Sequence, residues 1–286
     1  MNETTALLGD KPTNRMGFGA MQLTGPGVFG PPSDSSAARA VLRRAIELGV
    51  DHIDTAQFYG PDIVNDLIRQ ALYPYPESLK LVTKVGARRD AAGGVLPAQR
   101  PEELRQAVEE NLRSLRVERL SLVNLRLVDN RAGVPFEEQL DALEELRRAG
   151  KIDLIGLSNV DQAHLERALR LVDIAAIQNG YSIIDRRDDP LVDFARERRI
   201  AFVPFFPLGS SFRGGPARLG ADAAIVEAAK KHGATPAQIA LAWLLARYER
   251  MLLIPGTSSI AHLEENMAAA EIELDEADLA ALDRPR

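Results

Sequence analysis

Three residue types suited to proton transfer follow short apolar stretches in the first third of the chain. Asp54 comes directly after the predicted strand Val50–Ile53, and Tyr59 lies on the loop that follows. Lys84 stands near the end of the predicted strand Leu79–Val85. A tyrosine is a weak acid with a pKa of about 10, and a nearby cation lowers that pKa by favouring the phenolate. A buried lysine needs an anionic partner, which Asp54 provides. Together they predict a general acid that protonates a developing alkoxide.

The same three residues also have a structural interpretation. Aspartate commonly caps helices, tyrosine is often partly buried, and an aspartate–lysine pair can be a purely structural ion pair. The residues at the ends of the other predicted strands distinguish between the two interpretations.

The rest of the chain alternates apolar segments with amphipathic ones. Strands are predicted at Met16–Met21, Val50–Ile53, Leu79–Val85, Leu120–Leu125, Ile152–Leu157, Ile174–Gln178, Ile200–Phe206 and Met251–Ile254. Helices are predicted at Ala38–Leu48, Asp62–Leu72, Pro101–Leu115, Pro135–Ala149, Asp161–Leu171, Pro190–Arg199, Ala221–His232, Thr235–Arg247 and Ile260–Ala270, and from Asp275 onward. Strands without polar alternation are buried on both faces, as in a parallel sheet covered by helices.

A doubly wound open sheet shares this alternation and binds dinucleotides through a GxGxxG motif. The nearest match, Gly17–Gln22, lacks the third glycine and runs into a long loop. We therefore predict an α/β fold with one (β/α)8 TIM barrel domain over residues 1–286. An N-terminal β-hairpin around Gly9–Pro12 opens it, and extra helices lie near the C-terminus.

Composition excludes several classes of protein. The net charge is −6 with scattered basic residues, which argues against a nucleic-acid or anionic-membrane partner. There is no cysteine, and the four histidines lack metal-ligand spacing, so no metal site is expected. The N-terminus has no signal-peptide pattern, and the longest apolar run, Ile239–Ala246, is too short to cross a bilayer. We expect a cytoplasmic protein.

Barrel enzymes place their sites at the carboxyl ends of the strands. In this chain those ends carry Asp54, Lys84, Arg126, Ser158, Asn159, Gln178 and the segment Gly256–Ser259. No second carboxylate ends a strand next to Asp54, so a hydrolase with paired carboxylates is poorly supported. The clustering favours the catalytic interpretation of Asp54 and Lys84.

The sequence resembles the aldo-keto reductases along essentially its whole length. The matching motifs are Asp54–Ala56 with Tyr59–Gly60, Thr83–Gly86, Gly156–Asn159, and Ile254–Ser259 with Glu265–Asn266. The resemblance implies a (β/α)8 barrel, NADPH extended across its mouth, and hydride transfer to a small aldehyde or ketone. It makes Tyr59 the proton donor, Lys84 the neighbour that lowers its pKa, and Asp54 the partner of the lysine.

The sequence departs from the family on the fourth predicted strand, where Arg126 replaces the usual histidine. An arginine donates hydrogen bonds but cannot act as a neutral imidazole. The hypothesis is that Arg126 orients or polarises the substrate. The alternative is that it points away and pairs with Asp129.

The resemblance also assigns a cofactor site. In it Ser158, Asn159 and Gln178 bind the carboxamide, Phe205 stacks on the nicotinamide, Leu208 and Ser210 face the pyrophosphate, Gly256, Thr257, Ser258, Ser259 and His262 surround the 2′-phosphate, Glu265 and Asn266 hold the adenine, and Gly19 and Met21 complete the site. Relatives often place Lys or Arg where this chain has Gly256 and His262. NADPH is therefore the inferred cofactor, and NADH stays open.

The segments that carry a narrower likeness are Gly19–Leu23, Gly25–Pro32, Val123–Arg126 and Phe205–Gly209. They resemble a bacterial branch of the family that reduces pyridoxal with NADPH and shares the arginine. It implies reduction of pyridoxal to pyridoxine in a pocket formed by Met21, Phe58, Arg126 and the loops Met21–Pro32 and Gly86–Arg100. The second loop is expected to be a solvated turn rather than a lid. Alternatives are a broad aldehyde or sugar reductase, and an NADPH-binding sensor with little turnover.

Overall fold

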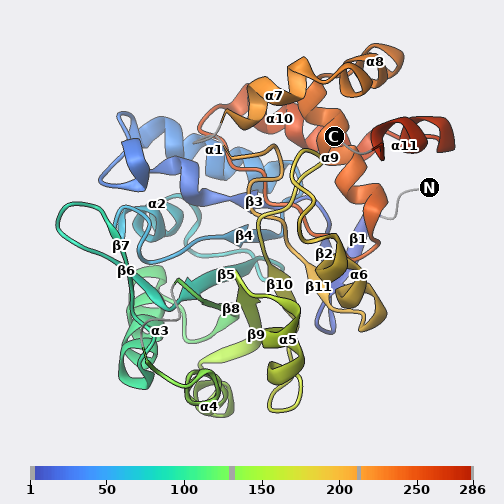
Figure 1. The fold of residues 1–286 in the computed structure, drawn as a ribbon. Coiled ribbons are helices and arrows are strands. Elements are labelled where there is room, and N and C mark those ends of the chain that lie inside the picture. Colours follow the sequence, from blue (N-terminus) through green and yellow to red (C-terminus); the bar gives the residue numbers. More distant parts are fainter. Residues whose placement is uncertain (1–3, 129–132, 211–213, 285–286) are drawn as a thin grey trace.

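The computed structural model describes residues 4–128, 133–210 and 214–284, and its centre is a curled parallel sheet surrounded by helices (Figure 1). The strands lie in the order β11, β10, β9, β8, β5, β4, β3, with every pair parallel. Their bounds are β3 (Phe18–Gly19), β4 (His52–Asp54), β5 (Lys80–Val85), β8 (Leu120–Arg126), β9 (Ile152–Ser158), β10 (Ala176–Gln178) and β11 (Ala201–Phe202). All carboxyl ends therefore meet at one edge.

The predicted eighth strand, Met251–Ile254, forms only isolated bridges. The backbone N–H of Leu252 donates to Phe202 in β11, and that of Leu253 donates to Arg15, just before β3. Successive peptide groups thus pair with opposite edges of the sheet, so neither ladder becomes long enough to count as a strand. This segment therefore bridges the two edges of the curled sheet, an arrangement consistent with a (β/α)8 barrel.

Helices cover the outside of the sheet. They are α1 (Ser35–Glu47), α2 (Ile63–Leu72), α3 (Pro101–Leu115), α4 (Phe136–Arg148), α5 (Gln162–Ala168), α6 (Asp189–Glu197), α7 (Gly215–Ala221), α8 (Ala223–His232), α9 (Pro236–Arg247), α10 (Ile260–Ala268) and α11 (Glu276–Leu282). Their starts follow the sequence signals: Asp34 caps α1, and Thr235 with Gln238 forms a capping box at α9. None of the helices in the described residues has the length and apolar character to span a membrane.

Two antiparallel hairpins extend this framework. The strands β1 (Thr5–Leu8) and β2 (Lys11–Asn14) form the first hairpin. Leu8 joins the apolar side chains inside the sheet, at the end away from the carboxyl edge. The second hairpin pairs β6 (Ala87–Arg89) with β7 (Val95–Pro97), where the sequence predicted a plain turn.

Inside the sheet, Gly156 of β9 leaves room for a neighbouring side chain. A Cβ built on Gly156 would lie 2.3 Å from Oδ1 of Asn124 and 3.1 Å from the carbonyl oxygen of Ala176. We expect Gly156→Ala to lower the free energy of unfolding by about 1–3 kcal/mol, because the packed interior cannot absorb an extra methyl group. Urea unfolding measures this.

Gly220→Ala is the matched control. Gly220 lies in α7, and a Cβ there meets nothing within 4 Å. That change is expected to leave stability unchanged or to raise it by up to about 1 kcal/mol. Equal stabilities of the two variants would contradict the tight packing around Gly156.

Candidate active site

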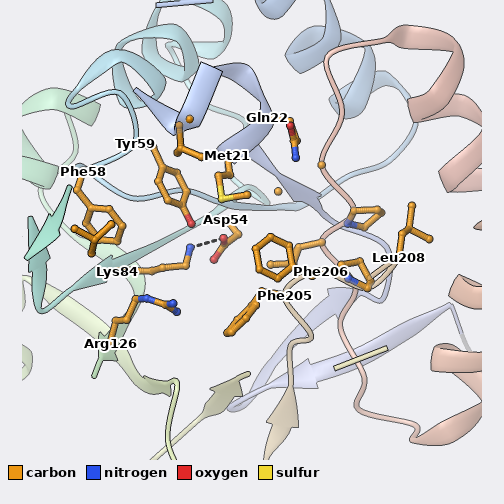
Figure 2. Close-up of a pocket in the computed structure, with 18 of the residues that line it drawn as sticks. Met21, Gln22, Asp54, Phe58, Tyr59, Lys84, Arg126, Phe205, Phe206 and Leu208 are labelled. Carbon is orange, nitrogen blue, oxygen red and sulfur yellow. Dashed lines mark hydrogen bonds and ion pairs between the residues drawn. The ribbon is translucent and has the colours of Figure 1, made fainter. Parts of the chain in front are cut away.

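A cleft of about 460 Å³ opens at the carboxyl edge of the sheet (Figure 2). Its lining includes the residues Gly19, Met21, Asp54, Phe58, Tyr59, Lys84, Arg126, Phe205, Leu208 and Gly256 that the sequence assigned to a site. They come from elements far apart in the chain. The parallel sheet brings them together because its strands all end at this edge.

Asp54 and Lys84 form a buried ion pair at the floor of the cleft. Nζ of Lys84 lies 2.5 Å from Oδ1 of Asp54, and the two side chains are 3% and 5% exposed, respectively. Nζ also donates to the carbonyl oxygen of Thr55 at 3.0 Å. Oδ2 of Asp54 accepts a hydrogen bond from Nε2 of Gln178 at 2.7 Å, a contact that the sequence did not predict.

Lys84 carries a positive charge in this environment. Burial by itself lowers the pKa of Lys84, but the Asp54 carboxylate and the Tyr59 hydroxyl oppose it, and the net pKa is raised. Both interactions favour the charged ammonium. The lysine is therefore a fixed cation beside the tyrosine.

Tyr59 points its hydroxyl toward this ion pair (Figure 2). Nζ of Lys84 lies 4.9 Å from the centre of the Tyr59 ring, and the ring packs edge to face against Phe58 at 5.3 Å. The loop is held in place by Gly60, whose φ is +91° and whose Cβ, if present, would lie 2.6 Å from Ile63. Only glycine fits there without strain.

Arg126 lies at the end of β8 and reaches into the cleft (Figure 2). One of its terminal nitrogens donates to Oγ of Ser158 at 3.0 Å, and the guanidinium lies 5.2 Å from the centre of the Phe205 ring. Burial lowers the pKa of Arg126, against the effects of Tyr59 and Asp54, but an arginine stays protonated in proteins. The alternative pairing with Asp129 falls outside the described residues.

The three residues that the resemblance assigned to the nicotinamide carboxamide lie in different environments. Ser158 is buried and accepts the bond from Arg126. Asn159 is exposed, has a φ of +60°, and donates to the carbonyl oxygen of Leu127, so it does not line the cleft. Oε1 of Gln178 is buried and accepts no hydrogen bond from any described residue.

Farther from the ion pair, the segment that follows Met251–Ile254 leads into α10. Oγ of Ser259 caps this helix, and Oγ1 of Thr257 accepts from the backbone N–H of Ser259. Ser258 lines a second cavity of about 470 Å³, which shares Met21 with the first cleft. Three further assigned residues, His262, Glu265 and Asn266, are in α10, and Ser210 lies in the loop before α7. Glu265 accepts a hydrogen bond from Oγ1 of Thr235.

The cleft has further lining residues that the sequence did not assign to the site one by one, although three of them lie in the predicted pocket loop Met21–Pro32. They are Gln22, Gly27, Val28, Arg89, Val95, Phe206, Pro207, Gly209, Pro216, Ile254 and Pro255. Arg89 and Val95 come from the β6–β7 hairpin, which lies within the predicted pocket loop Gly86–Arg100. Within the described part of the chain, no three His, Cys, Asp or Glu side chains gather to hold a metal.

Comparisons with known proteins agree with this arrangement. Residues 15–285 match the model of the Aldo/keto reductase family. Pyridoxine 4-dehydrogenase of Escherichia coli (strain K12) is 48% identical over 287 residues, which cover 99% of this chain and 98% of that protein. An uncharacterized oxidoreductase of Schizosaccharomyces pombe is 38% identical over 98% of this chain and 89% of its own length.

Solved structures give the same result. A thermostable aldo-keto reductase in complex with the inhibitor epalrestat superposes with a TM-score of 0.83 at 30% identity, over 98% of each chain. An aldo/keto reductase from Klebsiella pneumoniae in complex with NADP and acetate has a TM-score of 0.81 at 26% identity, over 98% of this chain and 94% of its own. The chain therefore belongs to the aldo-keto reductase family of oxidoreductases.

Proposed function

We propose that this chain, acting as one catalytic domain, reduces pyridoxal to pyridoxine with NADPH. The observation that carries the chemistry is the direction of the Tyr59 hydroxyl toward the buried pair of Lys84 and Asp54. The 48% identity to a pyridoxine 4-dehydrogenase supports the substrate. Pyridoxine oxidation is the reverse of the proposed reaction, so one site serves both directions.

The residues of the cleft have distinct roles in proton transfer. Tyr59 donates its proton to the carbonyl oxygen as negative charge develops there. Lys84 stabilises the phenolate that remains, and Asp54 holds the lysine in place. Gln178, on β10, orients the carboxylate by a hydrogen bond from across the curled sheet. The bound NADPH supplies the hydride.

The residues present fit a nicotinamide cofactor. Oε1 of Gln178 is a buried acceptor without a described partner, which suits the N–H groups of a carboxamide. Gly19 and Gly256 lie against backbone at the edge of the cleft: a Cβ on Gly19 would lie 2.4 Å from the carbonyl oxygen of Ile254, and one on Gly256 would lie 2.4 Å from that of Gly19. Phe205 offers an aromatic face in the same cleft, and the α10 N-terminus offers N–H groups to a phosphate.

A substrate panel tests the proposal. NADPH oxidation is followed with pyridoxal, with other aromatic and aliphatic aldehydes, and with aldose sugars. We expect the highest kcat/KM for pyridoxal, and a higher value with NADPH than with NADH. Equal rates across the panel would favour a broad-specificity reductase. NADPH binding without turnover on any substrate would favour a sensor.

A further inference from the structure

Arg126 is the feature of the cleft that proton transfer does not account for. Among the described residues, no carboxylate forms an ion pair with Arg126; its guanidinium donates a hydrogen bond to the Ser158 hydroxyl and lies against the Phe205 ring. Asp54, the nearest acidic group in the lining, is already paired with Lys84 and bonded to Gln178. A partly buried guanidinium without a counter-charge is costly.

The described lining of the cleft has an excess of positive charge. It contains the cations Lys84, Arg89 and Arg126 and the single carboxylate Asp54. The chain as a whole carries a net charge of −6. The positive cleft is therefore a local feature, and it favours a ligand that brings negative charge.

The position of Arg126 limits where that charge can lie. Figure 2 shows Tyr59 on one side of Lys84 and Arg126 on the other, with both groups directed into the same space. An arginine has five N–H donors, and Arg126 uses one of them on Ser158. A substrate whose carbonyl oxygen meets Tyr59 can therefore present an adjacent substituent to the remaining donors of Arg126.

We propose that Arg126 binds an anionic oxygen on the carbon next to the one that bears the carbonyl, so that the preferred substrates are ortho-hydroxy aromatic aldehydes bound as phenolates. This rests on the proposed carbonyl reduction, and pyridoxal belongs to the class because its 3-hydroxyl adjoins its 4-formyl group. The phenolate oxygen makes and breaks no bond in the hydride transfer itself.

The chemistry explains why a permanent cation suits this position. A phenolate ortho to a carbonyl donates electrons into it and makes its carbon a poorer hydride acceptor. In addition, the negative charge that develops on the carbonyl oxygen lies close to the phenolate charge. A guanidinium beside the phenolate offsets both effects, and a neutral imidazole does not.

Two pairs of substrates test the assignment, each differing only at the oxygen in question. The first pair is pyridoxal and its 3-O-methyl ether. The second is 2-hydroxybenzaldehyde and 4-hydroxybenzaldehyde, measured above the pKa of both phenols. For the unmodified enzyme with NADPH, we expect kcat/KM to favour the ortho-phenolate member of each pair roughly 10- to 100-fold, as for a hydrogen bond to a charged group.

The variants Arg126→Met and Arg126→Lys identify the residue responsible. We expect the preference to fall to about onefold in Arg126→Met and to be partly retained in Arg126→Lys, which keeps the cation. Arg148→Met, on an exposed arginine of α4, is the matched control and should keep the full preference. Thermal unfolding and NADPH quenching verify that each variant is folded and binds cofactor.

The outcomes separate this assignment from the proposed function. An ortho preference that survives in Arg126→Met, or that is absent from the unmodified enzyme, overturns it. If 2-hydroxybenzaldehyde shows the preference but pyridoxal is no better than other ortho-hydroxy aldehydes, the pyridoxal assignment fails and the role of Arg126 stands. Dissociation constants of the two hydroxybenzaldehydes for the NADP⁺ complex, which has no hydride to transfer, give the same comparison without turnover.

Discussion

The Tyr59→Phe variant is expected to lose kcat for carbonyl reduction by about 10²- to 10⁴-fold, the usual contribution of a positioned general acid. The change removes one hydroxyl and keeps the ring that packs against Phe58 and lies over Lys84. NADPH should still bind with its normal affinity. NADPH oxidation measures kcat, and quenching of protein fluorescence measures binding.

Tyr73→Phe is the matched control for this experiment. Tyr73 is 49% exposed and does not line the cleft, so its hydroxyl has no expected role in turnover. The control should retain the kcat of the unmodified enzyme. If Tyr59→Phe keeps more than a tenth of kcat, another group must donate the proton.

The Lys84→Met variant is expected to lose both stability and activity. Removing the ammonium leaves the Asp54 carboxylate buried with only its hydrogen bond from Gln178. Breaking a buried ion pair on one side costs about 3–5 kcal/mol. Urea unfolding measures this loss, and NADPH oxidation measures the accompanying fall in kcat.

The double variant Lys84→Met with Asp54→Asn separates these two effects. It removes both charges, so we expect it to regain at least half of the lost stability, because no uncompensated charge remains. Its kcat should stay low, because the cation beside Tyr59 is still missing. Recovery of activity in the double variant would contradict a catalytic role for the lysine charge.

The pH dependence of this stability follows from the raised pKa of Lys84. A lysine whose pKa is higher in the folded than in the unfolded state stabilises the protein fully below its unfolded pKa of about 10.4. The contribution disappears only as the pH rises through the folded pKa. The stability difference between the unmodified enzyme and Lys84→Met should therefore be constant between about pH 6 and 9.

The order of helices and strands was largely predictable, and the exceptions share a cause. The hairpin of β6 and β7 has three residues in each strand, and α7 begins in a glycine-rich segment. Elements this short have little periodicity of their own. They form because neighbours supply contacts, as where Oδ1 of Asp90 accepts backbone hydrogen bonds from Ala92 and Gly94 in the hairpin turn.

The carboxylate and the lysine at neighbouring strand ends were visible in the sequence. Asp54 and Lys84 each follow an apolar run, and the regular geometry of adjacent parallel strands brings such ends together. A local pattern sufficed because each side chain needs only the strand that carries it and the strand beside it.

Contacts across the sheet were decided by the tertiary structure alone. Gln178 reaches Asp54 from 124 residues away, and that contact depends on the curvature of the whole sheet. The left-handed backbone at Asn159 turns its side chain out of the cleft. That Arg126 has no ion pair within the described part of the chain likewise depends on which carboxylates other side chains already bind. Such outcomes depend on where every competing group lies, and a one-dimensional pattern of residues does not contain that information.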